Sequence, residues 1–509
     1  MKRINQFTRN SMLNNYNIVM LNLFQHLFIA NIHYARFRNK FGMTFFDRIE
    51  RRAFKTIMLV LLWSTLSAAQ FQLPKYENYI LENGLTLYLM EQHEVPLIYI
   101  SAIFPAGAVW DENKSGLAAF TADALLFGTK NYTKKQIEET FDFLGASISS
   151  HARKETAEIT ISFKKSDLDK VLPIFVDVIT NPTFPQVEFD KRKKRWLIEL
   201  EQAKESPRRV IGSYFDKFIF GGNVYGNPVS GSNSSIEDLN REDLPGFFGM
   251  HYRISKLGVA VVGDFSTGEM KNKIESMFPR TPSLEQLNLI IDVNKDINEF
   301  EKSNVLLIDK DDSRETTFLI GSYGVAWNNK DITQIQVINT IFGGRFTSWL
   351  NDELRVNSGL TYGARSRFTN YKSAGTFYIS SFTANKTTIE AIDLALEVLD
   401  RLHTKGVDEA TLTSAKNYIK GQFPPRYETS GELADLLTTM YFYGLDDSYI
   451  NDFEKNVDEM TVENANEIIA RYFPKENLQF VLVGKADEIR DKVKKYGEVT
   501  EKAIEEDGF

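Results

Sequence analysis

The chain has 509 residues but no cysteine and only six histidines. Without cysteine, the protein forms no disulfide, no thiolate zinc site and no lipid-modified N-terminal cysteine. None of the histidines forms an H-x-x-E-H or H-x-x-x-H pair, the spacings that bring two imidazoles to one helix face. The sequence also lacks a G-x-S-x-G nucleophile elbow. An autonomous hydrolase is therefore the weakest of the functional interpretations.

Charge is distributed unevenly along the chain. Residues 1–69 carry ten Lys or Arg and two Asp or Glu, so the remainder has a net charge of −16. Because phosphate binding needs a basic face, this acidity argues against nucleic acid as the main partner. The hydrophobic fraction of 43% and the chain length supply enough material for more than one core.

The N-terminal region has the pattern of a secretory signal. Basic residues precede an apolar run of 11 residues at 56–66, and small residues follow it up to Ala69. We therefore expect residues 43–69 to be a signal peptide and residues 1–42 to be an over-extended start. The run is too short to span a bilayer comfortably, so no stable membrane span is expected after cleavage, although an uncleaved anchor is the alternative. Export would place the chain in the periplasm or elsewhere in the bacterial cell envelope.

Two distant segments repeat one another. Residues 235–265 align with 456–486 at a constant offset of 221, and both read as a helix, a loop and an apolar strand that ends in glycine. This indicates a domain duplication rather than a short-period solenoid. In each half, strand-like runs come first and helical periodicity follows. The runs are 85–90, 97–104, 304–309 and 316–325 for strands, and 168–180 and 389–403 for helices.

This order predicts an α+β fold with two homologous domains, each a sheet with helices packed on it. We expect the N-terminal domain at residues 75–280 and the C-terminal domain at 304–495. The polar stretch 281–303 is expected to be a linker, and 496–509 a charged tail.

The segment 116–129 reads GLAAFTADALLFGT and resembles a zinc-peptidase helix, GLAHFLEHxLFxGT, of the insulinase / pitrilysin / mitochondrial processing peptidase family. The three chemical positions differ. The family's first histidine, glutamate and second histidine fall on Ala119, Ala122 and Asp123. Spacing of i, i+3 and i+4 puts all three on one helix face. Two alanines and an aspartate cannot bind a zinc ion and activate its water.

Further sequence motifs follow in the same order as in this family, so the resemblance covers about residues 75–495. Glu199, 76 residues after Asp123, occupies the position of the third zinc ligand. The resemblance implies two domains that face each other like a clamshell around a chamber, with no zinc in this chain. Two carboxylates could still hold a hard cation such as calcium, which usually takes 6–8 oxygens. We favour Glu199 as a remnant satisfied by water or by a nearby Arg or Lys.

A second segment, 342–368, resembles the family's C-domain segment, in which an Arg and a Tyr seven residues later reach toward the substrate. Arg355 and Tyr362 hold those places in the frame LRVNSGLTYG. Taken alone, both would be ordinary surface residues. The resemblance implies substrate binding, and a guanidinium and a phenol can hold a peptide carbonyl and stabilise its developing oxyanion.

The favoured hypothesis is a non-catalytic, substrate-gripping subunit of a heterodimeric periplasmic zinc endopeptidase. Such a chain is not expected to be active alone, because a homologous partner with an intact H-x-x-E-H would supply the zinc. The alternative is a peptide-binding or structural scaffold protein of the same fold without a hydrolytic role. Retention of Arg355 and Tyr362 argues against a pure scaffold.

Overall fold

The computed structural model describes residues 71–279 and 300–509. The expected start region (1–42), the expected signal peptide (43–69) and most of the expected linker (281–303) lie outside the described residues. In the described part of the chain, no helix is both long enough and apolar enough to cross a membrane.

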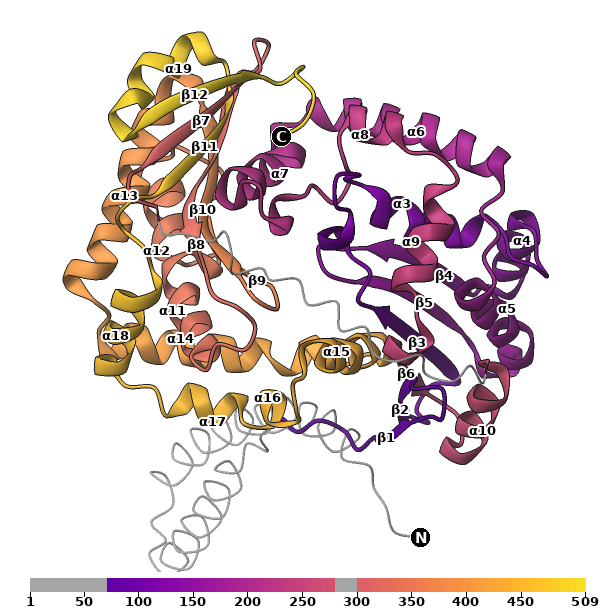
Figure 1. The fold of residues 1–509 in the computed structure, drawn as a ribbon. Coiled ribbons are helices and arrows are strands. Elements are labelled where there is room, and N and C mark those ends of the chain that lie inside the picture. Colours follow the sequence, from indigo (N-terminus) through magenta and orange to yellow (C-terminus); the bar gives the residue numbers. More distant parts are fainter. Residues whose placement is uncertain (1–70, 280–299) are drawn as a thin grey trace, which may run out of the picture. The chain divides into compact units, whose positions relative to one another are not determined.

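The N-terminal half is built on a six-stranded sheet in the order β1-β2-β6-β3-β5-β4 (Figure 1). Its central strand β6 is buried along its whole length because the run GVAVVG has helices on both sides. The strands are β1 (Glu77–Ile80), β2 (Thr86–Glu91), β3 (Leu97–Phe104), β4 (Ser147–Ala152), β5 (Ala157–Lys164) and β6 (Gly258–Gly263). The helices of this half are α3 (Leu117–Ala124), α4 (Lys134–Leu144), α5 (Leu168–Thr180), α6 (Gln186–Lys204), α7 (Pro207–Phe220), α8 (Asn233–Asp238), α9 (Asp243–His251) and α10 (Thr267–Met277).

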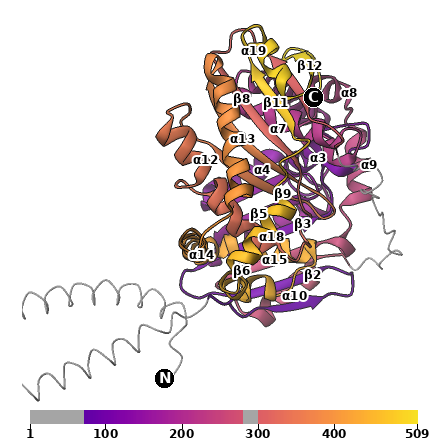
Figure 2. The same cartoon turned by 90° about the vertical axis from the view of Figure 1, so that its left-hand side faces the viewer.

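The C-terminal half has a second six-stranded sheet in the order β12-β7-β11-β8-β10-β9. Figure 2 shows helix α13 lying along the outer side of this sheet. The strands are β7 (Asn304–Asp309), β8 (Glu315–Tyr323), β9 (Arg365–Asn370), β10 (Gly375–Ala384), β11 (Gln479–Gly484) and β12 (Glu498–Ala503). The helices are α11 (Ile332–Asn339), α12 (Trp349–Asn351), α13 (Thr388–Lys405), α14 (Glu409–Gln422), α15 (Ser430–Tyr443), α16 (Ser448–Asn451), α17 (Phe453–Asp458), α18 (Val462–Tyr472) and α19 (Ala486–Val493).

The two halves are duplicates. Strand β6 begins at Gly258 and β11 at Gln479, which is the offset of 221 seen in the sequence, and each lies third in its sheet. Both strands pair in parallel with one neighbour and antiparallel with the other. The helix expected at 168–180 has those bounds as α5. The α+β fold class with two homologous sheet-plus-helices domains is confirmed.

The segment 496–509 differs from the expected charged tail because part of it completes the second sheet. Strand β12 pairs in parallel with β7, from Glu498 opposite Asn304 to Ala503 opposite Asp309. Its charged side chains remain compatible with a strand because β12 lies at the edge of the sheet. Arg490 of α19, for example, forms a hydrogen-bonded ion pair with Glu501. Charge alone therefore misled the sequence-based assignment.

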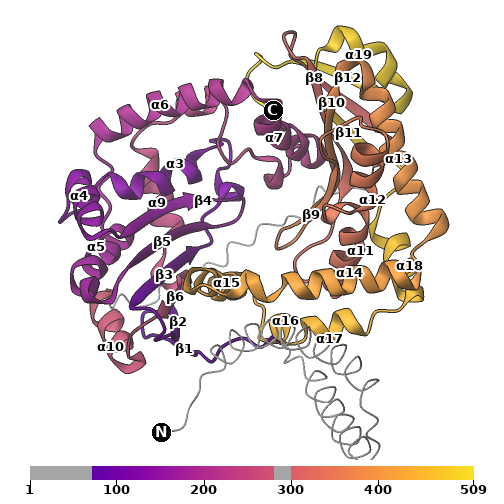
Figure 3. The same ribbon diagram turned by 180° about the vertical axis from the view of Figure 1, so that it is seen from behind.

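Each half also contributes one helix to the sheet of the other (Figure 3). Helix α7 of the N-terminal half packs on β8 and β11, where Phe215 and Tyr214 join the aliphatic side chains of the second sheet. Helix α15 of the C-terminal half packs on β3 and β6, where Leu433 and Leu437 cover Val262. Burial of these apolar surfaces stabilises the two halves as one unit.

A buried carboxylate lies where the halves meet. Glu155, in the turn between β4 and β5, is only 7% exposed. It accepts hydrogen bonds from the hydroxyls of Tyr225 and Tyr443, at 2.7 and 2.9 Å, and from the backbone N–H of Lys372 in the β9–β10 turn. Charge-assisted hydrogen bonds of this kind fix the two strand turns relative to each other.

Candidate functional site

Helix α3 carries the positions of the degenerate zinc motif. It starts after Gly116, whose φ of 95° is readily adopted only by glycine. The buried carboxylate of Asp111 accepts hydrogen bonds from the backbone N–H groups of Gly116 and Ala118, at 2.8 and 2.7 Å. Burial raises the pKa of Asp111 to about 8, although these hydrogen bonds oppose the shift. The start of the helix is therefore held in place independently of any metal.

The side chains at two of the three motif positions are buried. Ala122 is fully buried, and its carbonyl accepts a hydrogen bond of 2.6 Å from the Ser150 hydroxyl of β4. Ala119 is 8% exposed, whereas the Asp123 side chain is 34% exposed. Only Asp123 extends from this face toward α6.

An arginine joins the two remaining carboxylates of the former ligand set. The Nε of Arg192, on α6, donates to Oδ2 of Asp123 at 2.5 Å, and its Nη1 donates to Oε2 of Glu199 at 2.9 Å. Burial alone would lower the pKa of Arg192, but the hydrogen bonds to Asp123 and Glu199 raise it above its usual value. The guanidinium thus stays charged and pairs with both carboxylates, so that it offsets one of their two negative charges.

Aromatic rings support this ion-pair cluster from below. The guanidinium of Arg192 lies 4.4 Å from the ring centroid of Trp196, one helical turn further along α6. The Trp196 ring stacks in turn on Phe120 of α3, with centroids 5.2 Å apart, and its Nε1 donates to the Ser230 carbonyl at 3.0 Å. A cation above an indole face is electrostatically favourable, so the position of the arginine is well defined.

These residues do not fit a zinc ion. Catalytic zinc takes three protein ligands, whereas this cluster has two alanines and two carboxylates that already share a fixed cation. In residues 71–279 and 300–509, no group of three or more His, Cys, Asp or Glu side chains could hold a metal. Calcium, which takes oxygens without a competing cation, gains no support either.

The sequence held a partial signal for this arrangement. The run RKKRW at 192–196 places several cations before Glu199, which is consistent with the expected Arg or Lys partner for that carboxylate. Local helix rules favour Arg195, four residues before Glu199, as the partner. The structure uses Arg192 instead, since from two turns away it reaches Asp123 of α3 as well.

The second set of predicted residues lies beside irregular helix in the C-terminal half. Arg355 is in a π-helical segment, Asp352–Asn357, and its guanidinium lies 4.5 Å from the ring centroid of Phe346. Tyr362 follows in a loop, with 82% of its surface exposed. Within the described residues, no hydrogen bond or ring contact joins Arg355 to Tyr362. They are neighbours on one segment rather than a contacting pair.

Buried polar groups hold this exposed segment in a defined shape. Asn351 is 4% exposed, and its side chain donates to the Phe346 carbonyl at 2.6 Å and accepts from the backbone N–H of Ala364 at 3.3 Å. Beyond Tyr362, the hydroxyl of Ser381 donates to the Gly363 carbonyl at 3.0 Å. An exposed aromatic side chain on an anchored loop is a feature of binding surfaces.

Sequence reasoning missed Phe346, which is 65% exposed and forms the apolar face beneath Arg355. A pattern of single residues does not show which aromatic side chains remain outside a core. The spacing of Phe346 and Arg355 was also uninformative because irregular helix separates them.

Comparison with known proteins agrees with this geometry. The family model described as Insulinase (Peptidase family M16) matches residues 89–233, and the model described as Peptidase M16 inactive domain matches 238–419. A third model, Mother cell inhibitor of FtsZ, matches the short stretch 475–500 around β11 and α19. The two M16 models together cover more than half of the chain.

Relatives carry both peptidase and non-peptidase names. An uncharacterized zinc protease of Rickettsia bellii is 27% identical over 62% of this chain and 76% of its own length. The non-peptidase homolog YmxG of Helicobacter pylori is 21% identical over 77% of this chain and 90% of its own. The mitochondrial-processing peptidase subunit beta of Bos taurus is 23% identical over 84% of this chain and 89% of its own.

A solved structure shares the fold. The peptidase M16 inactive domain from Pseudomonas fluorescens superimposes with a TM-score of 0.74, covers 81% of this chain and 98% of its own, and is 24% identical. The duplicated sheets, the altered zinc motif and both family models indicate the same family. The chain belongs to the insulinase (peptidase M16) family, as a non-catalytic M16-like protein.

Proposed function

We propose that this chain is the substrate-gripping subunit of a heterodimeric zinc endopeptidase and pairs with a homologous subunit that carries H-x-x-E-H. The observation that supports this most strongly is the contrast between its two candidate sites. The N-terminal carboxylates are paired within the chain with Arg192, whereas Tyr362 and Phe346 remain exposed on an anchored segment.

In this proposal the chain supplies binding and the partner supplies zinc chemistry. The partner's metal would activate water and polarise the scissile carbonyl. Here Arg355 and Tyr362 would donate hydrogen bonds to the peptide backbone, and Phe346 would provide an apolar contact for a substrate side chain. Holding an extended peptide in one orientation raises the rate by reducing the entropy lost on reaching the transition state.

Export is part of the proposal. The basic and apolar pattern at 43–69 supports secretion to the periplasm or the cell envelope, with the mature chain starting after Ala69. An exported, cysteine-free subunit would fold without a requirement for disulfide formation.

The test mixes the chain with its zinc-bearing partner and measures cleavage of an unstructured peptide. Arg355→Ala and Tyr362→Phe should leave complex formation intact, as judged by sizing, and lower turnover. Loss of one oxyanion-type donor costs on the order of 10²–10³ in rate, and loss of a carbonyl contact costs less. Tyr418→Phe is the matched control, since Tyr418 is 42% exposed on α14 and has no assigned role.

Unchanged turnover in both variants would reject substrate gripping and leave the scaffold function in its place. A complex that no longer forms would show instead that these side chains belong to the subunit interface.

A further inference from the structure

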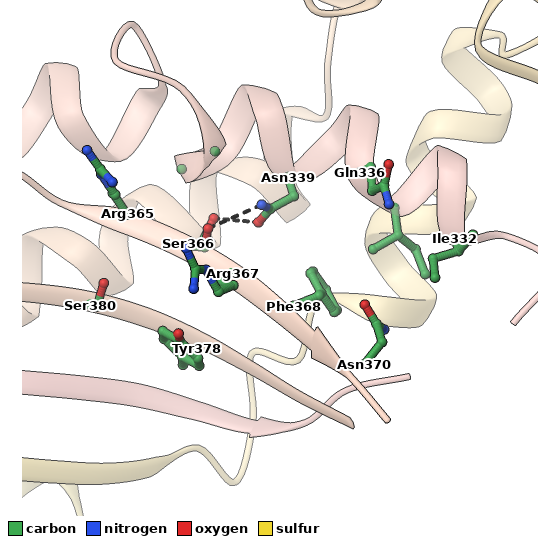
Figure 4. A pocket seen from close by; sticks show the side chains of 13 residues that line it. Ile332, Gln336, Asn339, Arg365, Ser366, Arg367, Phe368, Asn370, Tyr378 and Ser380 are labelled. Carbon is green, nitrogen blue, oxygen red and sulfur yellow. Dashed lines mark hydrogen bonds between the residues drawn. The ribbon is translucent and has the colours of Figure 1, made fainter. Parts of the chain in front are cut away.

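A cavity in the C-terminal half lies beside the proposed gripping segment. It has a volume of about 450 Å³ and is bounded by helix α11 on one side and strands β9 and β10 on the other (Figure 4). Strand β9 follows directly in the chain after the loop that holds Tyr362.

One wall of the cavity is closed and preorganised. Asn339 of α11 donates from its amide to the Ser366 carbonyl at 3.2 Å, and the Ser366 hydroxyl donates back to the amide oxygen at 2.6 Å. These bonds, drawn in Figure 4, tie α11 to the edge strand β9, and the first of them satisfies the backbone carbonyl of Ser366. Because α11 packs against β9 and occupies this carbonyl, we expect recognition here to depend on side chains rather than on addition of a strand.

Two exposed cations characterise the other wall. Arg365 and Arg367 flank Ser366 on β9, so both project from the face of the sheet opposite to Ser366 and α11, beside Ser380 and Tyr378 of β10. Among the described residues, no carboxylate forms an ion pair with either guanidinium, and none of the cavity-lining residues is acidic. Positive charge at this wall is thus not compensated within the described chain.

We propose that this cavity is a carboxylate-binding subsite for acidic peptides, in which Arg365 and Arg367 hold acidic side chains of an extended segment. A guanidinium pairs with a carboxylate through two parallel hydrogen bonds, and alternate residues of an extended peptide have the same two-residue spacing as the arginines. On β10, Ser380 lies opposite Arg365, and Tyr378, whose hydroxyl hydrogen-bonds with Arg367, lies opposite that arginine. The inference rests on the proposed function in naming the peptide class, but it concerns binding by this chain alone.

The test measures binding of short unstructured peptides to the whole mature chain by fluorescence anisotropy, without any partner. A peptide with Glu at alternate positions should bind about tenfold more tightly than its Gln counterpart, because two exposed ion pairs of modest strength are gained. The advantage should shrink as salt is raised. The double variant Arg365→Gln/Arg367→Gln should remove it, whereas Arg314→Gln, which changes an exposed arginine before β8, should not.

Equal binding of Glu and Gln peptides, or an advantage that survives in the double variant, would overturn the proposal. Glutarate that binds as tightly as the Glu peptide would overturn the assignment to peptides. Circular dichroism checks that the double variant is folded. If the Glu peptide binds as expected but Arg355→Ala and Tyr362→Phe leave turnover unchanged, the proposed function fails while this subsite stands.

Discussion

The two halves share one fold but treat their candidate functional groups in opposite ways. In the N-terminal half, Asp123 and Glu199 are paired through Arg192. In the C-terminal half, Tyr362 and Phe346 are exposed on a segment that Asn351 anchors from within. Charged groups satisfied inside the chain stabilise structure, whereas exposed groups on a rigid support are available to a ligand. The two duplicated halves thus differ: the candidate groups of the N-terminal half are paired within the chain, whereas those of the C-terminal half are exposed.

Restoring the zinc motif of the N-terminal half should give the largest effect on the contrast between the two halves. The triple variant Ala119→His/Ala122→Glu/Asp123→His should bind zinc poorly while Arg192 remains beside Glu199. At about 4 Å and an effective dielectric constant of about 20, each pair of unit charges repels by about 4 kcal/mol. Adding Arg192→Gln should therefore tighten zinc binding by ~10³-fold or more, measured by calorimetry.

The matched control adds Lys194→Gln to the triple variant instead, which removes an exposed cation of the same helix. Its zinc affinity should equal that of the triple variant. If the triple variant already binds zinc tightly with Arg192 in place, the guanidinium does not occupy the metal position.

Acidification should have the next largest effect, through histidines of the two halves. Burial, followed by the charges of Lys256 and Arg253, lowers the pKa of His251 to about 4, below the usual 6.5. The unfolded chain therefore binds this proton first, so stability present above pH 6.5 is lost as the pH falls toward 4, by at most about 3 kcal/mol. In the C-terminal half, burial also lowers the pKa of His403, but the hydrogen bond between its Nε2 and the Phe473 carbonyl opposes that shift.

His251→Phe keeps a ring against Trp110 and Phe247 but removes the proton. The difference in unfolding midpoint between the parent chain and this variant, followed from pH 7.5 to 4.5, isolates His251 from other titrating groups. The parent should lose stability relative to the variant across this range. Parallel curves would show that His251 is not held neutral by burial.

Removing one anchor from each site gives the smallest effects and sharpens the contrast. Asn351→Ala leaves the Phe346 carbonyl and the Ala364 N–H without their partner, which should cost about 1–3 kcal/mol in urea unfolding. Arg192→Gln breaks an ion pair whose Glu199 side chain is 48% exposed, so solvent screening limits the loss to about 1 kcal/mol or less. A larger loss of unfolding free energy for Arg192→Gln than for Asn351→Ala would contradict this contrast, because the stronger anchor would then lie in the N-terminal half.

Much of the fold was predictable because the hydrophobic periodicity of both halves was strong. Helix α5 and strands β3 and β7 have the bounds expected from the sequence. Strand β12 was missed because an edge strand can keep charged residues, which makes it resemble a tail. The exchange of α7 and α15 between the sheets was also missed, since periodicity shows an apolar face without identifying the surface that covers it.

The candidate sites were predictable only as positions. The motif frame located Ala119, Ala122, Asp123 and Glu199, but not the choice of Arg192 over Arg195 as their partner. That choice depends on the distance between α3 and α6, which no local pattern contains. In the same way, nothing in the sequence brought Arg365 and Arg367 together with α11 around a cavity.

The most direct test of the central claim is the zinc content of the purified mature chain, measured by elemental analysis after dialysis without chelator. Because Arg192 already pairs with both carboxylates and no imidazole is present at Ala119 or Asp123, we expect no stoichiometric zinc. About one zinc per chain would contradict the account and would show that the N-terminal half binds metal as a metallopeptidase domain does.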